Sequence, residues 1–384
     1  MAQSVEDLVE RLGRGERRAL ARLLTLVEDG APGRLREVVG ALHPRTGGAR
    51  VIGITGSPGV GKSTLTNALT TQLRARDRSV AILAVDPSSP FSGGALLGDR
   101  VRMQGHHADP KVFIRSMASR GHLGGLSFAT PQAVLVLDAA GFDDVIVETV
   151  GVGQSEVEIA ATADTTVVAL APGMGDSVQA AKAGILEVAD LFVINKADAP
   201  GAGKLESELR SMLELGQATS GRTTADLLEE HPDLLDHHPE LAPPVGGDPE
   251  LAEDAELVPG SAASGWWPPI LRTVAVRGEG VSEVVDAFDQ HRDHLVASGQ
   301  AEERSRERAL HTVREIALEQ VRARFARLAG GVGPGGPNDH GRSRRRGGAG
   351  DPLLDALAAK VAGRDLDPYT AADQLLEALE GGDA

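Results

Sequence analysis

Two kinds of hydrophobic periodicity divide the chain. Over residues 4 to about 44, apolar positions recur at helical spacing among many charges, which predicts two or three amphipathic helices. From Val51 to about Leu295, short apolar runs alternate with helical stretches, a pattern typical of a parallel sheet with helices on both faces. The expected strands are Val51–Thr55, Val80–Val85, Val145–Glu148, Thr165–Leu170, Leu191–Asn195 and Ile270–Val276. The pattern therefore predicts an α/β fold with a doubly wound parallel sheet.

Two segments interrupt this pattern. Residues 221–260 hold eleven acidic residues and a single basic one, Arg222, so we expect a largely disordered surface insertion. Residues 330–350 are rich in Gly and Pro and contain a cluster of arginines. We expect a disordered linker there, with a basic docking site for an acidic partner or for the acidic insertion as the alternative. Beyond the sheet we expect a long helix from Glu302 to Leu328 and two shorter helices between Pro352 and Leu379.

These boundaries predict three parts in a chain of 384 residues. Residues 1–46 form an N-terminal helical extension, and residues 47–298 form the sheet domain with the acidic insertion 221–260 inside it. Residues 299–384 form a C-terminal helical region that contains the linker 330–350.

Composition narrows the classes of partner. The net charge of −16 argues against a general nucleic-acid or membrane-surface protein, because either needs a basic face. The absence of cysteine excludes disulfides, thiolate zinc sites and cysteine nucleophiles. We find no signal-like start and no apolar run as long as a membrane span, and we therefore expect a cytoplasmic protein.

The strongest chemical signal is a complete G-x-x-x-x-G-K-[ST] loop between the first expected strand and a helical pattern. Its glycines let backbone N–H groups surround phosphates, and the helix N-terminus adds the positive end of its dipole. Lys62 would reach the β- and γ-phosphates, and the Ser63 hydroxyl would ligate Mg²⁺. A glycine-rich turn with solvated side chains is the alternative, and the full pattern with correct flanks disfavours it. The expected phosphate-binding residues are Gly56, Ser57, Pro58, Gly59, Val60, Gly61, Lys62, Ser63 and Thr64.

A second motif, Asn195-Lys196-Ala197-Asp198, follows an apolar strand and predicts guanine as the base. The Asp198 carboxylate can accept from guanine N1–H and N2–H₂ together, an arrangement that adenine lacks. Lys196 would pack over the base, and Asn195 would tie this loop to the phosphate loop. A helix-capping turn is the commoner meaning of such a short match, but its position at a strand end downstream of the phosphate loop favours base recognition. A further guanine-side loop is expected at Val274, Ala275 and Val276.

Three acidic residues are candidates for the metal and the catalytic water. Glu148 ends an apolar strand and would hold a Mg²⁺-bound water, while the N–H of Gly151 would sense the γ-phosphate. Many small GTPases use Asp at the position of Glu148, so the Glu indicates another branch. Asp86 and Asp99 are candidates for the Mg²⁺ shell or for activating water, with Asx-type capping and simple surface exposure as the alternatives. The predicted catalytic set is Lys62, Asp86, Asp99 and Glu148, and the predicted metal set is Ser63, Asp86, Asp99 and Glu148.

Together these motifs resemble the methylmalonyl-CoA mutase-associated GTPases, the MeaB/ArgK family. The resemblance covers nearly the whole chain. It is carried most specifically by the phosphate loop, by the segments 84–89, 93–100 and 148–156, and by the motif at 195–198. Residues 171–182 are similar to the mobile segment through which the family communicates with its partner enzyme. The two insertions at 221–260 and 330–350 depart from the family pattern.

The resemblance implies a homodimeric, Mg²⁺-dependent P-loop GTPase with N-terminal helices and a C-terminal helical dimerisation arm. It implies an adenosylcobalamin-dependent acyl-CoA mutase as partner, with binding and hydrolysis of GTP gating the delivery of intact cofactor and the release of damaged cobalamin. Two other functions stay open. A nickel-inserting GTPase would show cysteine or clustered histidine ligands, and a kinase of an amino-acid-transport component would transfer phosphate to a protein acceptor.

Overall fold

The computed structural model describes residues 4–29, 32–86, 104–106, 108–118, 129–149, 155–173, 188–219, 265–328 and 360. The chain forms two compact units, Met1–Arg308 and Ala309–Ala384, and the fold that follows is that of the first. The expected insertion at 221–260 and linker at 330–350 lie outside the described residues. Of the helices expected between Pro352 and Leu379, only residue 360 is described, and it is helical.

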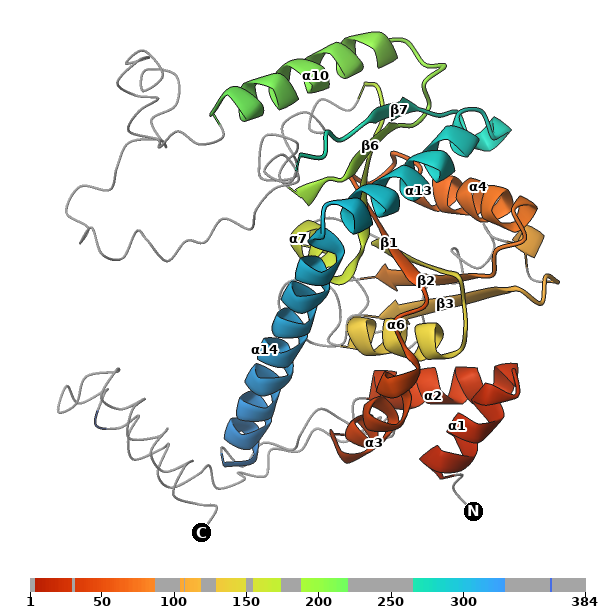
Figure 1. Cartoon of the computed structure of the whole chain (residues 1–384), viewed down its shortest axis with the longest axis vertical. Helices are drawn as coiled ribbons and strands as arrows, with labels where there is room; N and C mark the ends of the chain where they lie inside the picture. The colour runs from red at the N-terminus through yellow and green to blue at the C-terminus, as the bar shows by residue number, and fades with distance from the viewer. Residues whose placement is uncertain are drawn as a thin grey trace, which may run out of the picture. The chain divides into compact units, whose positions relative to one another are not determined.

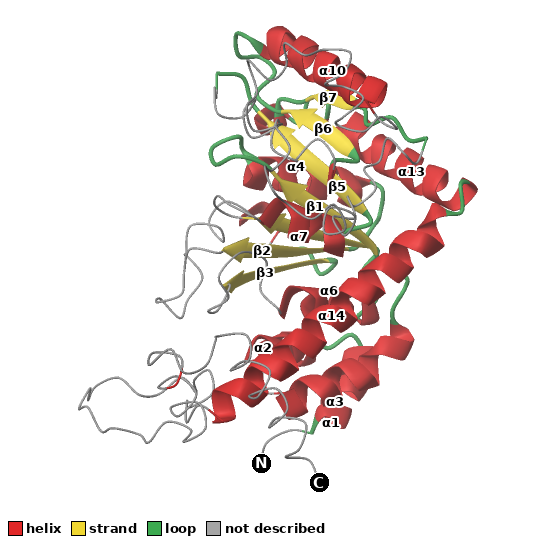
Figure 2. Cartoon of the chain, turned by 90° about the vertical axis from the view of Figure 1, so that its left-hand side faces the viewer, coloured by secondary structure: helices red, strands yellow, loops and turns green. Residues whose placement is uncertain are grey.

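The described residues of the first unit form one parallel sheet of seven strands, ordered β3-β2-β4-β1-β5-β6-β7 (Figure 1). The chain enters the sheet at β1 and extends it in both directions, which confirms the predicted doubly wound α/β fold. Figure 2 shows the strands as a single twisted layer bordered by helices. The strands are β1 Arg50–Thr55, β2 Val80–Asp86, β3 Val112–Ala118, β4 Asp144–Thr149, β5 Thr165–Leu170, β6 Leu191–Ile194 and β7 Ile270–Arg272.

One strand was missed and one was predicted too long. Strand β3 was missed, because Arg115 and Ser116 interrupt its apolar run. The Nε of Arg115 donates to the Oε1 of Glu28 at 2.9 Å, and Glu28 lies in an N-terminal helix 87 positions earlier in the chain. The strand expected at Ile270–Val276 ends at Arg272. There the chain turns into a short 3₁₀ helix, Ala275–Arg277, so the expected guanine-side residues lie in a turn and not in a strand.

Helices cover both faces of the sheet because successive strand residues point to opposite sides. Along β1, Ile52 and Ile54 belong to the cluster beneath α4 and α13, whereas Val51 belongs to the cluster beneath α6 and α7. Helix α10 packs through Leu205 and Leu209 against residues of β5 and β6. The helices concerned are α4 Lys62–Ala75, α6 Ala129–Ala139, α7 Ser155–Thr162, α10 Ala202–Thr219 and α13 Val281–Ala297.

Three amphipathic helices precede the sheet, at the upper end of the expected number (Figure 1). Ser4 caps the first one, since its Oγ accepts from the backbone N–H of Asp7 at 3.2 Å. Their apolar faces, including Leu8, Leu23 and Val38, join the core cluster that also contains residues of α6. The helices are α1 Val5–Gly13, α2 Arg17–Asp29 and α3 Pro32–Leu42, followed by a 3₁₀ turn at His43–Arg45.

The long helix expected from Glu302 begins two residues earlier, as α14 Gln300–Leu328. Its first turns are tied to the sheet domain by ion pairs from Arg304 to Asp190 and from Arg308 to Asp164. Among the helices that the structure describes, none combines the length and the apolar character that a membrane crossing requires.

Candidate functional site

The phosphate loop lies where the sheet topology places ligands, at the carboxyl end of the central strand β1 and at the start of α4 (Figure 1). Helix α4 begins at Lys62, and Gly61 is its N-cap. The Lys62 Nζ donates to the carbonyl oxygens of Gly56 and Ser57, at 2.6 and 3.3 Å, so the ammonium group sits inside the loop. The start of the helix presents backbone N–H groups and the positive end of its dipole, and with the enclosed ammonium group this makes the loop suited to phosphate.

Two loop positions require glycine for steric reasons. Gly56 has φ +138°, and a Cβ there would collide with the backbone carbonyl oxygen of Ala169 in β5. Gly61 has φ +95°, and its Cβ would lie 2.6 Å from the Nδ2 of Asn195. The glycine spacing of the motif is therefore also set by the close approach of the neighbouring strand and of the 195–198 loop.

Ser63 and Glu148 meet directly beside the phosphate loop. The Ser63 Oγ donates to the Glu148 Oε1 at 2.5 Å, and Glu148 is buried. The contact arises because β4 pairs with β1 in a register that sets Glu148 opposite Ile54, just before the loop. A hydroxyl and a carboxylate form the kind of oxygen donor set that Mg²⁺ takes, together with phosphate oxygens and waters. The residues present therefore fit a magnesium ion.

The other predicted metal and γ-phosphate residues are only partly described. Asp86 ends β2, two positions beyond Ala84, which pairs in register with Glu148. The backbone of Asp86 therefore lies at the same sheet edge as Glu148; its side chain, together with Asp99 and Gly151, lies outside the described residues. Among the residues that the structure describes, no group of three or more His, Asp and Glu side chains is placed to hold a metal ion.

The side chain of Asn195 connects three loops. Its Nδ2 donates to the carbonyl oxygen of Val60 at 2.9 Å, which is the expected contact with the phosphate loop. Its Oδ1 accepts from the Thr273 hydroxyl and from the Ala275 backbone N–H, each at 3.2 Å. The motif after β6 and the loop after β7 are thereby brought to the phosphate loop, although they are far apart in the sequence.

Lys196 and Asp198 occupy the outer part of the same site. Lys196 adopts φ +56°, uncommon for a residue with a side chain, and its Nζ donates to the carbonyl oxygen of Gly59 at 2.7 Å. Asp198 is half exposed, and its Oδ2 accepts from Arg277 Nη1 at 2.9 Å. Val276 is largely exposed, whereas Val274 and Ala275 are buried.

Arg277 and Glu279 were not among the predicted site residues, although both lie next to the expected guanine-side loop. Arg277 donates to Glu279 through Nε at 2.6 Å and through Nη2 at 3.2 Å, in addition to its bond with Asp198. The hydrogen bond with Glu279, and then that with Asp198, raises the pKa of Arg277 above its ordinary value. The same bond lowers the pKa of Glu279. Only the Gly-Glu-Gly sequence after Arg277 signals a tight turn there.

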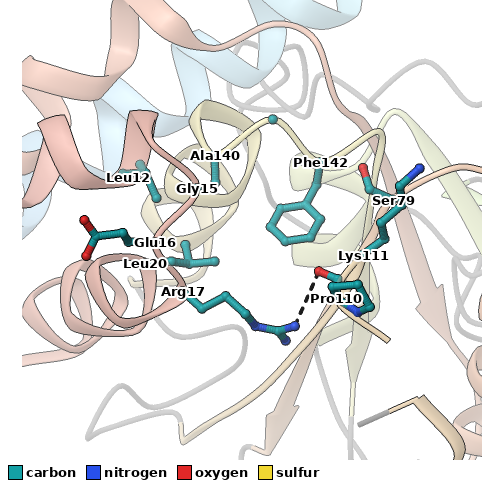
Figure 3. Close-up of a pocket in the computed structure, with 11 residues that line it drawn as sticks. Leu12, Gly15, Glu16, Arg17, Leu20, Ser79, Pro110, Lys111, Ala140 and Phe142 are labelled. Atoms are coloured by element: carbon teal, nitrogen blue, oxygen red, sulfur yellow. Dashed lines mark hydrogen bonds between the residues drawn. The ribbon is translucent and has the colours of Figure 1, made fainter. Parts of the chain in front are cut away.

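A separate cavity of about 200 Å³ lies at the amino ends of the strands, where α1 and α2 meet the residues before β2 and β3 (Figure 3). Arg17 donates to the carbonyl oxygens of Pro110 and Val112, at 3.4 and 2.6 Å, and Lys111 pairs with Asp77. No residue of the predicted site lines this cavity. The cavity lies between the N-terminal helices and the sheet, at the other end of the strands from the phosphate loop.

Comparison with known proteins agrees with this geometry. The family model described as "Methylmalonyl Co-A mutase-associated GTPase MeaB" matches residues 20–329. A putative GTPase of Pyrococcus abyssi is 41% identical over 378 residues, 98% of each chain. The mitochondrial methylmalonic aciduria type A homolog of Caenorhabditis elegans is 40% identical over 209 residues, 51% of this chain and 52% of that one. The crystal structure of a LAO/AO transport system kinase superposes with a TM-score of 0.59 at 25% identity, covering 99% of both chains.

A parallel sheet with a complete phosphate loop after its first strand, in a chain whose relatives are GTPases, defines a P-loop GTPase. The protein is therefore an enzyme of the nucleotide-hydrolysing class, as predicted. With the family model matched over most of its length, the chain belongs to the methylmalonyl-CoA mutase-associated GTPase family.

Proposed function

We propose that this GTPase is a chaperone for an adenosylcobalamin-dependent acyl-CoA mutase, most directly methylmalonyl-CoA mutase. GTP binding and hydrolysis would gate the loading of the cofactor and protect or reactivate the mutase. The observation that carries the proposal is the match to the mutase-associated GTPase model over residues 20–329. The similarity to a methylmalonic aciduria type A homolog supports the same class of partner.

The nucleotide would occupy the loops that Asn195 joins. The phosphates would lie in the loop from Gly56 to Thr64, where the Lys62 ammonium group would exchange the carbonyl oxygens of Gly56 and Ser57 for β- and γ-phosphate oxygens. The guanine base would lie between Lys196 and the 274–276 loop, with its N–H groups on Asp198. The hydrogen bonds of Asn195 would hold the phosphate loop and the two base-side loops together around the nucleotide.

Ser63 and Glu148 would hold Mg²⁺, with Asp86 and Asp99 as further candidates for its shell. When bound, the ion would neutralise charge that develops on the phosphates during hydrolysis. The chain's own contribution is mostly positional: the loop fixes the triphosphate, Lys62 stabilises negative charge, and the Gly151 N–H would contact the γ-phosphate.

We also propose a homodimer formed through residues 299–384 and a cytoplasmic location.

The similarity to a LAO/AO transport system kinase leaves phosphate transfer to a protein as the competing outcome. The two activities differ in the fate of the γ-phosphate: a GTPase releases it as inorganic phosphate, whereas a kinase leaves it on an acceptor. GTP labelled on its γ-phosphate therefore distinguishes them when it is incubated with the purified mutase and, in parallel, with a cell extract that supplies protein acceptors.

The partner is tested by capture of purified mutases on the immobilised full chain, with GDP and then with a non-hydrolysable GTP analogue. We expect a nucleotide-dependent complex with one adenosylcobalamin mutase and faster GTP hydrolysis when that mutase is added. Lys62→Ala should abolish both the hydrolysis and its stimulation, and Asp198→Asn should exchange GTP for xanthosine triphosphate. If the mutases neither bind nor change GTP turnover, the chaperone proposal is wrong, whereas unchanged turnover by Lys62→Ala would refute the phosphate site.

A further inference from the structure

An arginine lies between two carboxylates at the rim of the proposed base site. The guanidinium of Arg277 binds both oxygens of Glu279 on one side and the Oδ2 of Asp198 on the other. All three side chains are about half exposed. The fork geometry of arginine allows both contacts at once, which a point charge such as lysine does not.

The backbone turn holds Arg277 and Glu279 in this arrangement. Gly278 and Gly280 have φ +72° and +73°, and the Val274 N–H donates to the Glu279 carbonyl oxygen at 3.0 Å. A Cβ at Gly280 would collide with the carbonyl oxygen of Arg272. The side chain that grips Arg277 is thus mounted on a turn closed by a backbone hydrogen bond and by a position that only glycine fits.

Asp198 has enough acceptor capacity for both Arg277 and a base. A carboxylate offers about four lone-pair sites, and guanine N1–H and N2–H₂ would use two of them. The bond from Arg277 uses one site on Oδ2. It therefore need not break when guanine binds, and before binding it restricts the rotation of the carboxylate.

We propose that Arg277, held by Glu279, is a positioning residue that fixes the Asp198 carboxylate in the orientation that receives both guanine N–H groups. This inference rests on the guanine site proposed above and adds the residues that set its selectivity. Fixing the carboxylate in advance lowers the ordering cost of base binding. The benefit is greatest for a base that uses both carboxylate oxygens.

Guanine and hypoxanthine nucleotides separate this role from a general role in folding the loop. Hypoxanthine lacks the 2-amino group, so inosine diphosphate (IDP) makes a single hydrogen bond with Asp198 and depends less on how the carboxylate is turned. The test measures dissociation constants of GDP and IDP for the full-length wild type and for Arg277→Gln, at one fixed ionic strength because exposed ion pairs are screened by salt. Arg272→Gln is the matched control, since Arg272 has nearly the same exposure and pairs with Glu206, away from Asp198.

We expect Arg277→Gln to weaken GDP binding about threefold to tenfold and IDP binding less than about twofold, so that the preference for guanine falls. Glu279→Gln should shift the dissociation constants of GDP and IDP in the same direction as Arg277→Gln does. Arg272→Gln should change neither dissociation constant. In an Asp198→Ala background, adding Arg277→Gln should have no further effect on GDP, because no carboxylate is left to position.

Equal weakening of GDP and IDP by Arg277→Gln, or an undiminished effect in the Asp198→Ala background, would show that Arg277 acts on the loop as a whole and would overturn the inference. Unchanged GDP affinity in a folded Arg277→Gln variant would overturn it as well. The guanine site itself is judged separately, by whether the wild type prefers GDP over ADP. A wild type with that preference and an insensitive Arg277 therefore refutes only the positioning role.

Discussion

Replacing Asn195 by Ala should loosen the site, because this one side chain joins its three loops. The Asn195 side chain is buried and makes three hydrogen bonds, with Val60 O, the Thr273 hydroxyl and the Ala275 N–H. Each bond joins the loop after β6 to a different point of the phosphate loop or of the loop after β7. The substitution removes all three and leaves their buried partners to find other acceptors and donors.

The loss can be estimated from the number of bonds. At about 1 kcal/mol net for each hydrogen bond, Asn195→Ala should lower the free energy of unfolding by about 3 kcal/mol. Nucleotide binding should weaken too, because the proposed phosphate and base loops would have to be reordered at each binding event. A tenfold weaker Kd would cut the stabilisation by GDP, at one hundred times the wild-type Kd, from about 2.7 to about 1.4 kcal/mol.

The assay is urea unfolding followed with and without GDP, for the wild type, Asn195→Ala and Ser207→Ala. Ser207 is a matched control, since its hydroxyl makes one local bond on the exposed face of α10 with the carbonyl oxygen of Gly203, 3.0 Å away. Its loss should stay within about 0.5 kcal/mol of the wild type. If Asn195→Ala behaves like this control in both conditions, the hydrogen bonds do not couple the loops and the reasoning fails.

Three further predictions concern the metal site and the buried charges. Glu148→Gln should raise the Mg²⁺ concentration for half-maximal GTP hydrolysis about tenfold without unfolding the protein, and an unchanged Mg²⁺ titration would remove Glu148 from the metal site. Asp144→Ala should lower the free energy of unfolding by about 3–5 kcal/mol in urea, because it leaves the buried Arg50 without its buried partner. Asp289 pairs with the same arginine, but its side chain is 54% exposed, so Asp289→Ala should cost under about 1 kcal/mol. Burial raises the pKa of Asp190, but the hydrogen bonds and charges of His291 and Arg304 together outweigh it, so the net pKa lies below the ordinary 3.8. The stabilisation from Asp190 should therefore be present above that pH and be lost as the pH falls through the lower folded value. An acid unfolding curve equal to that of Asp190→Asn would contradict this.

The sheet could be predicted from the sequence wherever strands consist of apolar and β-branched residues without a charge inside the run. Strand β5 is buried along its whole length and was predicted at its actual bounds, because its threonine, valine, alanine and leucine residues are typical of a strand covered on both faces. The edge strand β3 escaped detection because Arg115 has its partner, Glu28, in an N-terminal helix. No local pattern shows that such a charge will be neutralised by a distant segment.

In the candidate site too, features formed by residues close in sequence were predicted, and contacts between distant residues, apart from that of Asn195 with the phosphate loop, were not. The phosphate loop and the motif at 195–198 are local, since their glycine, lysine and carboxylate positions follow from the chemistry of a phosphate and a base. Their mutual placement is not local: it depends on the strand order, which sets β4 and β5 beside β1, and on the turn after β7. The Ser63–Glu148 contact and the Arg277 bridge exist only in the folded chain.

The sequence alone thus determined the class of fold, the phosphate loop and the base motif, because each depends on residues within a few positions of one another. The tertiary structure decided which carboxylate meets Ser63, which asparagine contacts join the loops and which arginine holds Asp198. Those contacts join residues between 78 and 135 positions apart, and the order of the parallel strands, together with the turn after β7, brings them within hydrogen-bonding distance. Long-range pairing is the one property of this site that no local pattern contains.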